Sequence, residues 1–148
     1  MTTLTALDPS LYQDLVGVPY CHNGRDPRVG LDCFGLVLAI HARMGTPLPD
    51  PYTVVPTTYG SDGDPGDHQW LLQQLFGEWR PADPAPGLVA VFSRFGKRPD
   101  HAGVFITERR FIHAIHYRYQ TTGQVVISDR ARSPFDEWFI GAYAYAGH

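Results

Sequence analysis

The sequence predicts one α+β domain over residues 1–148, in which N-terminal helices pack on one side of a C-terminal antiparallel β-sheet. Apolar residues recur at helical spacing between residues 33 and 44, which indicates an amphipathic helix. After Gly77 the pattern changes to short β-prone segments separated by turns. The 15 glycines and 13 prolines indicate many turns and short elements, which argues against a helical bundle.

Composition and charge exclude several classes of protein. With 43% hydrophobic and 18% charged residues, the chain is globular and long enough to bury a core without disulfides or metals. A formal net charge of −3 gives no electrostatic footprint for nucleic acid. No stretch approaches the roughly 18 apolar residues that a membrane span needs. Met1 to Ser10 lacks the basic flank and apolar run of a signal peptide, so we expect synthesis in the cytoplasm.

The first expected element is a short helix near the N-terminus. Asp8 is a predicted N-cap, and Pro9 suits the first position of a helix that should end near Leu15. A loop is expected over residues 18–30, with a turn at Asp26-Pro27.

The main helix is expected between residues 33 and 44. Asp32 is its predicted N-cap, and Gly45 is the predicted residue just beyond its C-terminal end. The spacing places five apolar side chains on one helical face: Cys33, Leu36, Val37, Ile40 and Met44.

A long connection rich in Pro, Gly, Thr and Asp is expected over residues 48–66. Asp67 is expected to cap a third short helix that runs through Phe76. The strands of the sheet follow, at residues 88–93, 101–107, 111–119, 124–128 and 137–145.

Cys33 lies at the first turn of the main helix, where a thiol has a candidate chemical role. Backbone N–H groups and the helix dipole favour the thiolate there and lower the thiol pKa from about 8.5. The thiolate is the nucleophilic form of cysteine. A buried structural thiol is the alternative, because an unreactive cysteine packs as a small hydrophobic residue.

A thiolate nucleophile needs a base and a group that orients the base. His101 begins an alternating strand, and His113 lies twelve residues later in the next strand. A two-residue hairpin loop would turn these side chains to opposite faces, whereas an odd-length loop or a bulge places them on the same face. Ordinary surface or core histidines remain the alternative for each.

Several motifs, in order along the chain, resemble the NlpC-type cysteine peptidases of bacterial cell walls. They cover roughly residues 15–115 and comprise Gly17-Val18-Pro19-Tyr20, Gly24, Gly30-Leu31-Asp32-Cys33-Phe34-Gly35-Leu36-Val37, Gly45, Leu48-Pro49, Pro86-Gly87-Leu88-Val89-Ala90-Val91-Phe92, His101-Ala102-Gly103-Val104-Phe105-Ile106 and Phe111-Ile112-His113-Ala114.

The resemblance implies a papain-like fold and a Cys–His–His triad at Cys33, His101 and His113. It implies that Tyr20 helps to form the oxyanion hole, together with the backbone N–H of Cys33, and that Asp32 contacts the substrate. The family usually cleaves amide bonds next to D-glutamate in peptidoglycan stem peptides, so the expected partner is such a stem peptide.

Two departures from the family pattern bear on the substrate and the setting. Phe34 stands where the family commonly has serine near the substrate amine, so Phe34 is expected to border the substrate. The missing signal peptide and the Gly24-Arg25-Asp26-Pro27 segment resemble the version found in bacteriophage tail assembly proteins. That version would be incorporated in a phage tail, with tail proteins as partners, and would act on the periplasmic cell wall.

Other assignments stay open at the level of sequence. A structural tail protein could keep the fold without turnover, and an interbacterial amidase toxin would use the same triad. A lipid-directed acyltransferase is less favoured, because no amphipathic or membrane segment is evident. Cys21 is expected to be a thiol, with a reversible disulfide to Cys33 as the alternative. No metal or cofactor is expected, because neither His113 with His116 nor the Asp62, Asp64 and Asp67 group has ligand spacing.

Overall fold

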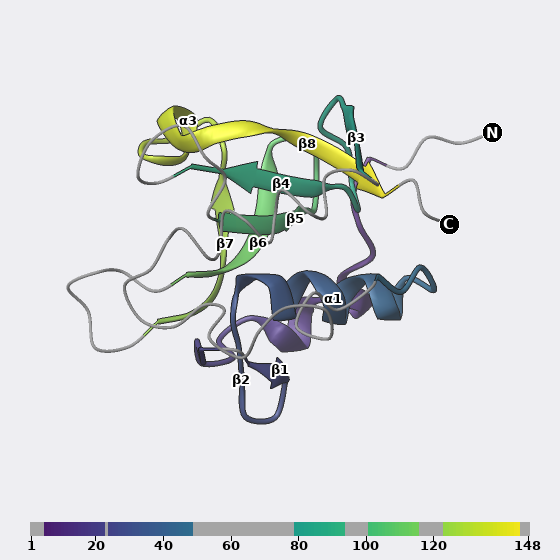
Figure 1. Cartoon of the computed structure of the whole chain (residues 1–148), viewed down its shortest axis with the longest axis vertical. Coiled ribbons are helices and arrows are strands. Elements are labelled where there is room, and N and C mark those ends of the chain that lie inside the picture. Colours follow the sequence, from purple (N-terminus) through teal and green to yellow (C-terminus); the bar gives the residue numbers. More distant parts are fainter. Residues whose placement is uncertain (1–4, 23, 49–78, 94–100, 116–122, 146–148) are drawn as a thin grey trace.

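A computed structural model describes residues 5–22, 24–48, 79–93, 101–115 and 123–145. These residues form an α+β fold with an antiparallel sheet, as the sequence predicts, and the sheet has six strands where five were expected (Figure 1). In spatial order the strands are β3 (Trp79–Ala82), β8 (Phe139–Tyr145), β4 (Val89–Phe92), β5 (His101–Phe105), β6 (Arg110–Ile115) and β7 (Gln124–Asp129).

The sheet differs from a simple meander at one edge. The last strand, β8, lies between β3 and β4 and pairs antiparallel with both. Strand β3 has no counterpart among the predicted strands, because Pro81 interrupts its short apolar pattern. A short helix, α3 (Phe135–Trp138), precedes β8, so the final strand begins at Phe139 and not at Glu137.

Helix α1 (Cys33–Arg43) begins and ends where the sequence predicts. The Asp32 side chain caps it by accepting a hydrogen bond of 2.6 Å from the backbone N–H of Gly35. Gly45 follows the helix with a φ of 81°, a conformation that favours glycine. The helix lies against β5 and β6 (Figure 1).

The N-terminal helix is replaced by two 3₁₀ turns, η1 (Pro9–Leu11) and η2 (Gln13–Leu15). The predicted Asp8 cap is confirmed, since its side chain accepts a hydrogen bond of 3.0 Å from Ser10 N. Tyr12 has a φ of −143°, which breaks the helical path between the two turns.

The region expected as a loop before α1 contains a small hairpin of β1 (Arg25–Asp26) and β2 (Gly30–Leu31). Each strand has two residues, which is too short for an alternating pattern to reveal it. The predicted turn is confirmed, because Asp26 accepts hydrogen bonds from the backbone N–H groups of Arg28 and Val29.

Some expectations fall on residues that the structure does not describe. The connection after Leu48, the helix over residues 67–76 and the end of the strand expected to reach Tyr119 lie outside the described residues. Within the described part of the chain, no helix is long and apolar enough to cross a membrane.

Two layers of apolar side chains cover the two faces of the sheet. On one face, Leu36, Val37 and Ile40 of α1 pack with side chains from the strands. On the other face, α3 supplies Phe135 to an aromatic cluster. The strand residues of the first layer include Trp79, Val89, Val91, Ala102, Val104, Ile112, Ala114 and Val125, and those of the second include Ala90, Phe92, Phe105, Phe111, Ile115 and Ala142.

The turn between β5 and β6 sets which side chains share a face. Phe105 pairs with Phe111, so five residues separate the paired positions and the connection has odd length. This register gives His101 and His113 the same facing direction, which resolves the ambiguity left by the sequence.

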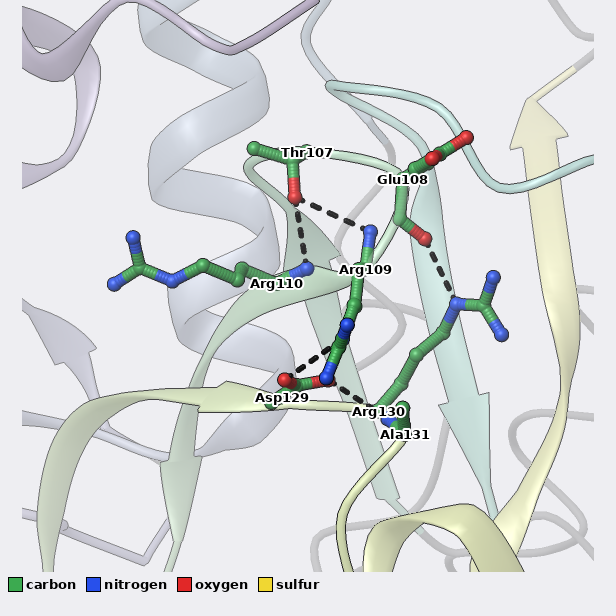
Figure 2. Close-up of polar contacts among 7 residues, drawn as sticks. All are labelled: Thr107, Glu108, Arg109, Arg110, Asp129, Arg130 and Ala131. Atoms are coloured by element: carbon green, nitrogen blue, oxygen red, sulfur yellow. Dashed lines mark hydrogen bonds and ion pairs between the residues drawn. The ribbon is translucent and has the colours of Figure 1, made fainter.

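Polar contacts hold this turn in place (Figure 2). Thr107 Oγ1 accepts hydrogen bonds from the backbone N–H groups of Arg109 and Arg110, at 3.2 and 2.9 Å. The Arg109 side chain bonds both carboxylate oxygens of Asp129 at the end of β7, and it lowers the pKa of that carboxyl. Arg130, the residue after β7, donates to the carbonyl oxygen of Glu108 at 2.8 Å. The Arg109 and Arg130 side chains thus both connect the turn to the C-terminal end of β7.

Candidate active site

Cys33 is the first residue of α1 and is nearly buried, with 4% of its surface exposed. A tight contact between the helix and Gly24, the residue before β1, fixes this junction. A Cβ atom at Gly35 would collide with the carbonyl oxygen of Gly24, so only glycine fits at this position. The Gly35 in the Asp32-Cys33-Phe34-Gly35 motif thus lets the hairpin approach the helix start.

Asp32 makes a capping hydrogen bond and an ion pair next to Cys33. Its Oδ1 accepts the capping hydrogen bond and also pairs with Arg25 Nη1 at 2.8 Å. Arg25 donates from the same nitrogen to the carbonyl oxygen of Gly24, at 2.9 Å. The Asp32 side chain is 2% exposed and Arg25 is 23% exposed, so this ion pair is largely shielded from water. Sequence reasoning missed Arg25, because no local pattern connects it to a residue seven positions later.

The structure brings His101 and His113 together. His101 Nε2 lies 2.7 Å from His113 Nδ1, within hydrogen-bond distance. His113 Nε2 in turn lies 2.8 Å from Ser128 Oγ on β7. Both imidazoles are buried, at 2% and 0% exposure. These contacts form a chain of polar side chains across β5, β6 and β7.

Aromatic rings fix the positions of the two imidazoles. The Phe92 ring lies 5.8 Å from the His101 ring. The His113 ring lies 4.5 Å from that of Phe111 and 5.1 Å, edge to face, from that of Phe135. Such packing limits the orientations that the two rings can adopt.

Gly103 provides the space in which His113 sits. A Cβ atom at Gly103 would lie 2.6 Å from the carbonyl oxygen of Ile112 and 3.0 Å from His113 Cβ. A side chain there would therefore push β6 away from β5. The resemblance motif contains this glycine, but its role depends on strand pairing and could not be read from the sequence.

Replacement Gly103→Ala is expected to lower kcat/KM by about 10²-fold, since displacement of a positioned group by about 1 Å has that order of effect. Overpacking should also lower the free energy of unfolding by about 1–3 kcal/mol. Turnover rates and thermal unfolding measure the two effects. Gly141→Ala is the matched control, because a Cβ at that strand position meets nothing nearer than 3.5 Å. Equal losses in the two variants would contradict the assigned role.

Backbone pairing connects the start of α1 with the end of the sheet that carries His113. Tyr20 bridges to Leu31, two residues before Cys33, and its N–H donates to Gly123 O at 2.9 Å. Pro19 bridges to Gln124, which pairs with Ile115 on β6. The helix start is thus tied through two short bridges to the strand of His113.

The remaining predicted residues have distinct environments. Tyr20 is half-buried at this junction, and Phe34 is buried at 2% exposure in the first turn of α1. Cys21 is half-buried, and both Cys21 and Cys33 are thiols. Ser128 was not anticipated, although alternation along β7 would have placed it on the His113 face once the pairing was known.

Comparison with known proteins gives one family and several similar folds. The model of the NlpC/P60 family matches residues 17–143. A solved structure described as similar to a lipoprotein of the NLP/P60 family, from Staphylococcus aureus subsp. aureus Mu50, is 18% identical with a TM-score of 0.61. That match covers 100% of this chain and 45% of the staphylococcal one, so the chain spans less than half of its length.

A second solved structure is the NlpC/p60 domain of the peptidoglycan hydrolase SagA. It is 19% identical with a TM-score of 0.50, and the match covers 91% of each chain. At these identities the two structures establish likeness of fold. No curated protein sequence matches the chain.

Proposed function

The chain belongs to the NlpC/P60 family, and from this premise we propose that it is a cysteine peptidase that hydrolyses amide bonds in peptidoglycan stem peptides. Members of this family are typically peptidoglycan hydrolases. The observation that carries the proposal is the 2.7 Å contact between His101 Nε2 and His113 Nδ1. It engages one nitrogen of the proposed base with an orienting group, so we assign the other nitrogen, Nδ1, to Cys33.

The proposed reaction uses Cys33 as the nucleophile. His101 Nδ1 takes the thiol proton, and Sγ attacks the carbonyl carbon of the scissile amide. The backbone N–H of Cys33 and the hydroxyl of Tyr20 stabilise the oxyanion. His101 then protonates the leaving amine, and water hydrolyses the thioester. His113 holds the His101 ring throughout.

Local electrostatics support a reactive thiolate at Cys33. The first turn of α1 presents backbone N–H groups and the positive end of the helix dipole to Sγ. The adjacent Asp32 carboxylate would by itself oppose a second negative charge. Its ion pair with Arg25 at 2.8 Å offsets that repulsion.

Substrate contacts and biological setting extend the proposal. We assign Asp32 and Phe34 to the substrate-binding side of Cys33, on the resemblance of the Asp32-Cys33-Phe34 motif. The carboxylate of Asp32 is already paired with Arg25, and Phe34 has no polar group. These features favour a substrate whose group beside Asp32 and Phe34 carries less positive charge than a free amine. We also propose that the protein acts with phage tail proteins on the periplasmic cell wall.

Digestion of purified peptidoglycan, analysed by mass spectrometry of the muropeptides, tests the proposed function. The Cys21→Ala protein is the enzyme to use, because Cys33 is then the single cysteine of the sequence. New stem-peptide fragments should appear, and prior alkylation with iodoacetamide should prevent them. Intact stem peptides, or fragments that persist after alkylation, would overturn the proposal. Slow alkylation at neutral pH together with intact peptides would favour a structural protein without turnover.

A further inference from the structure

Ser128 is the third member of the polar chain that starts at His101. Its hydroxyl oxygen lies 2.8 Å from His113 Nε2 and is partly buried. On the paired strands β6 and β7, Phe111 is opposite Ser128 and His113 is opposite Val126. Ser128 is therefore the diagonal neighbour of His113 on the same face of the sheet.

The hydrogens on His101, His113 and Ser128 must be placed so that His101 can act as the base. A protonated His101 carries hydrogen on both ring nitrogens, so its Nε2–H must donate to His113 Nδ1 at 2.7 Å. His113 can accept there only if its own hydrogen is on Nε2. That hydrogen then points at Ser128 Oγ, which must accept it.

The opposite tautomer would disable the base. If His113 carried its hydrogen on Nδ1, it would donate to His101 Nε2, and the hydrogen of neutral His101 would move to Nδ1. That nitrogen is the one assigned to Cys33, and it could not then accept the thiol proton. The tautomer of His113 thus decides whether His101 can act.

We infer that Ser128 is a positioning residue whose hydroxyl accepts the Nε2–H of His113 and thereby stabilises the tautomer of His113 that accepts from the imidazolium form of His101. This inference rests on the proposed Cys33–His101 chemistry. Ser128 does not touch the reacting atoms and acts through His113. The effect depends on the hydroxyl group. Threonine keeps this hydroxyl and suits a β-strand, so Ser128→Thr should preserve the hydrogen bond to His113.

Long-range ¹H–¹⁵N NMR correlation of the imidazoles in the full chain tests the tautomer directly. The wild-type protein should show His113 protonated on Nε2 at neutral pH, and protonation on Nδ1 would overturn the inference. In Ser128→Ala, the Nε2–H form should lose its dominance. This measurement needs no activity, so it decides the inference even if the protein does not hydrolyse peptidoglycan, a result that would overturn the proposed function.

Kinetics of Ser128→Ala and Ser128→Thr give the second test. Loss of one hydrogen bond in Ser128→Ala should lower kcat about tenfold with little change in KM, and the acidic limb of the pH profile should move. Ser128→Thr should stay within about twofold of wild type, since it keeps the hydroxyl. Equal kcat and an unchanged pH profile in all three proteins would overturn the inference. So would equal losses in both variants, which indicate packing alone.

Discussion

Cys33→Ala protein is expected to lose peptidoglycan hydrolysis by about 10⁴-fold or more, because removal of a covalent nucleophile leaves only binding and oxyanion stabilisation. The substitution removes one sulfur atom from a nearly buried site at the start of α1. Alanine is the best helix former, and the Asp32 cap accepts its hydrogen bond from the backbone N–H of Gly35, which the substitution keeps. The fold should therefore persist while the reaction stops.

Cys21→Ala is the matched control for this experiment. Cys21 is the other cysteine of the sequence and lies half-buried before the β1–β2 hairpin. Its loss should leave the rate within about twofold of wild type, since its thiol has no role in the proposed reaction. Muropeptide release and circular dichroism should be measured on both variants. Residual hydrolysis by folded Cys33→Ala protein would sink the assignment of the nucleophile.

Local signals in the sequence predicted the elements that depend on local chemistry. The N-cap at Asp32 and the glycine at Gly45 lie at the ends of α1 as expected, because both act within one helical turn. Strands β4 to β7 also lie in their expected segments, since buried strands retain an apolar pattern. The insertion of β8 between β3 and β4 depends on long-range pairing, which no local pattern encodes.

In the candidate site, too, the sequence identified individual residues but not the contacts that depend on long-range pairing. The two histidines could be nominated from the sequence, but their common face depends on the five residues between the paired Phe105 and Phe111. The contact of Ser128 with His113 depends on the register of β6 against β7. Arg25 reaches Asp32 only because the β1–β2 hairpin folds back on the helix start. Each of these pairings joins residues that are distant in sequence or separated by a turn of unknown length.

His101→Gln is expected to reduce kcat/KM by about 10³-fold or more, because the amide cannot take the thiol proton or return it to the leaving amine. Glutamine can still offer a hydrogen-bond partner toward His113 Nδ1, so the buried His113 need not be left unsatisfied. The loss should therefore appear chiefly in kcat. The rate of Cys33 alkylation near neutral pH should fall as well, since the thiolate loses its imidazolium partner.

Two comparisons make the His101→Gln result specific. His22→Gln, at an exposed position, should leave both hydrolysis and alkylation unchanged. His113→Asn should lose less than His101→Gln, because an amide oxygen can still accept the Nε2–H of His101, whereas nothing replaces the proton transfer at Nδ1. Retention of hydrolysis by folded His101→Gln, or a larger loss in His113→Asn, would exclude His101 as the base. The second result would instead assign the role of base to His113, and its partly buried contact with Ser128 would then be the orienting bond.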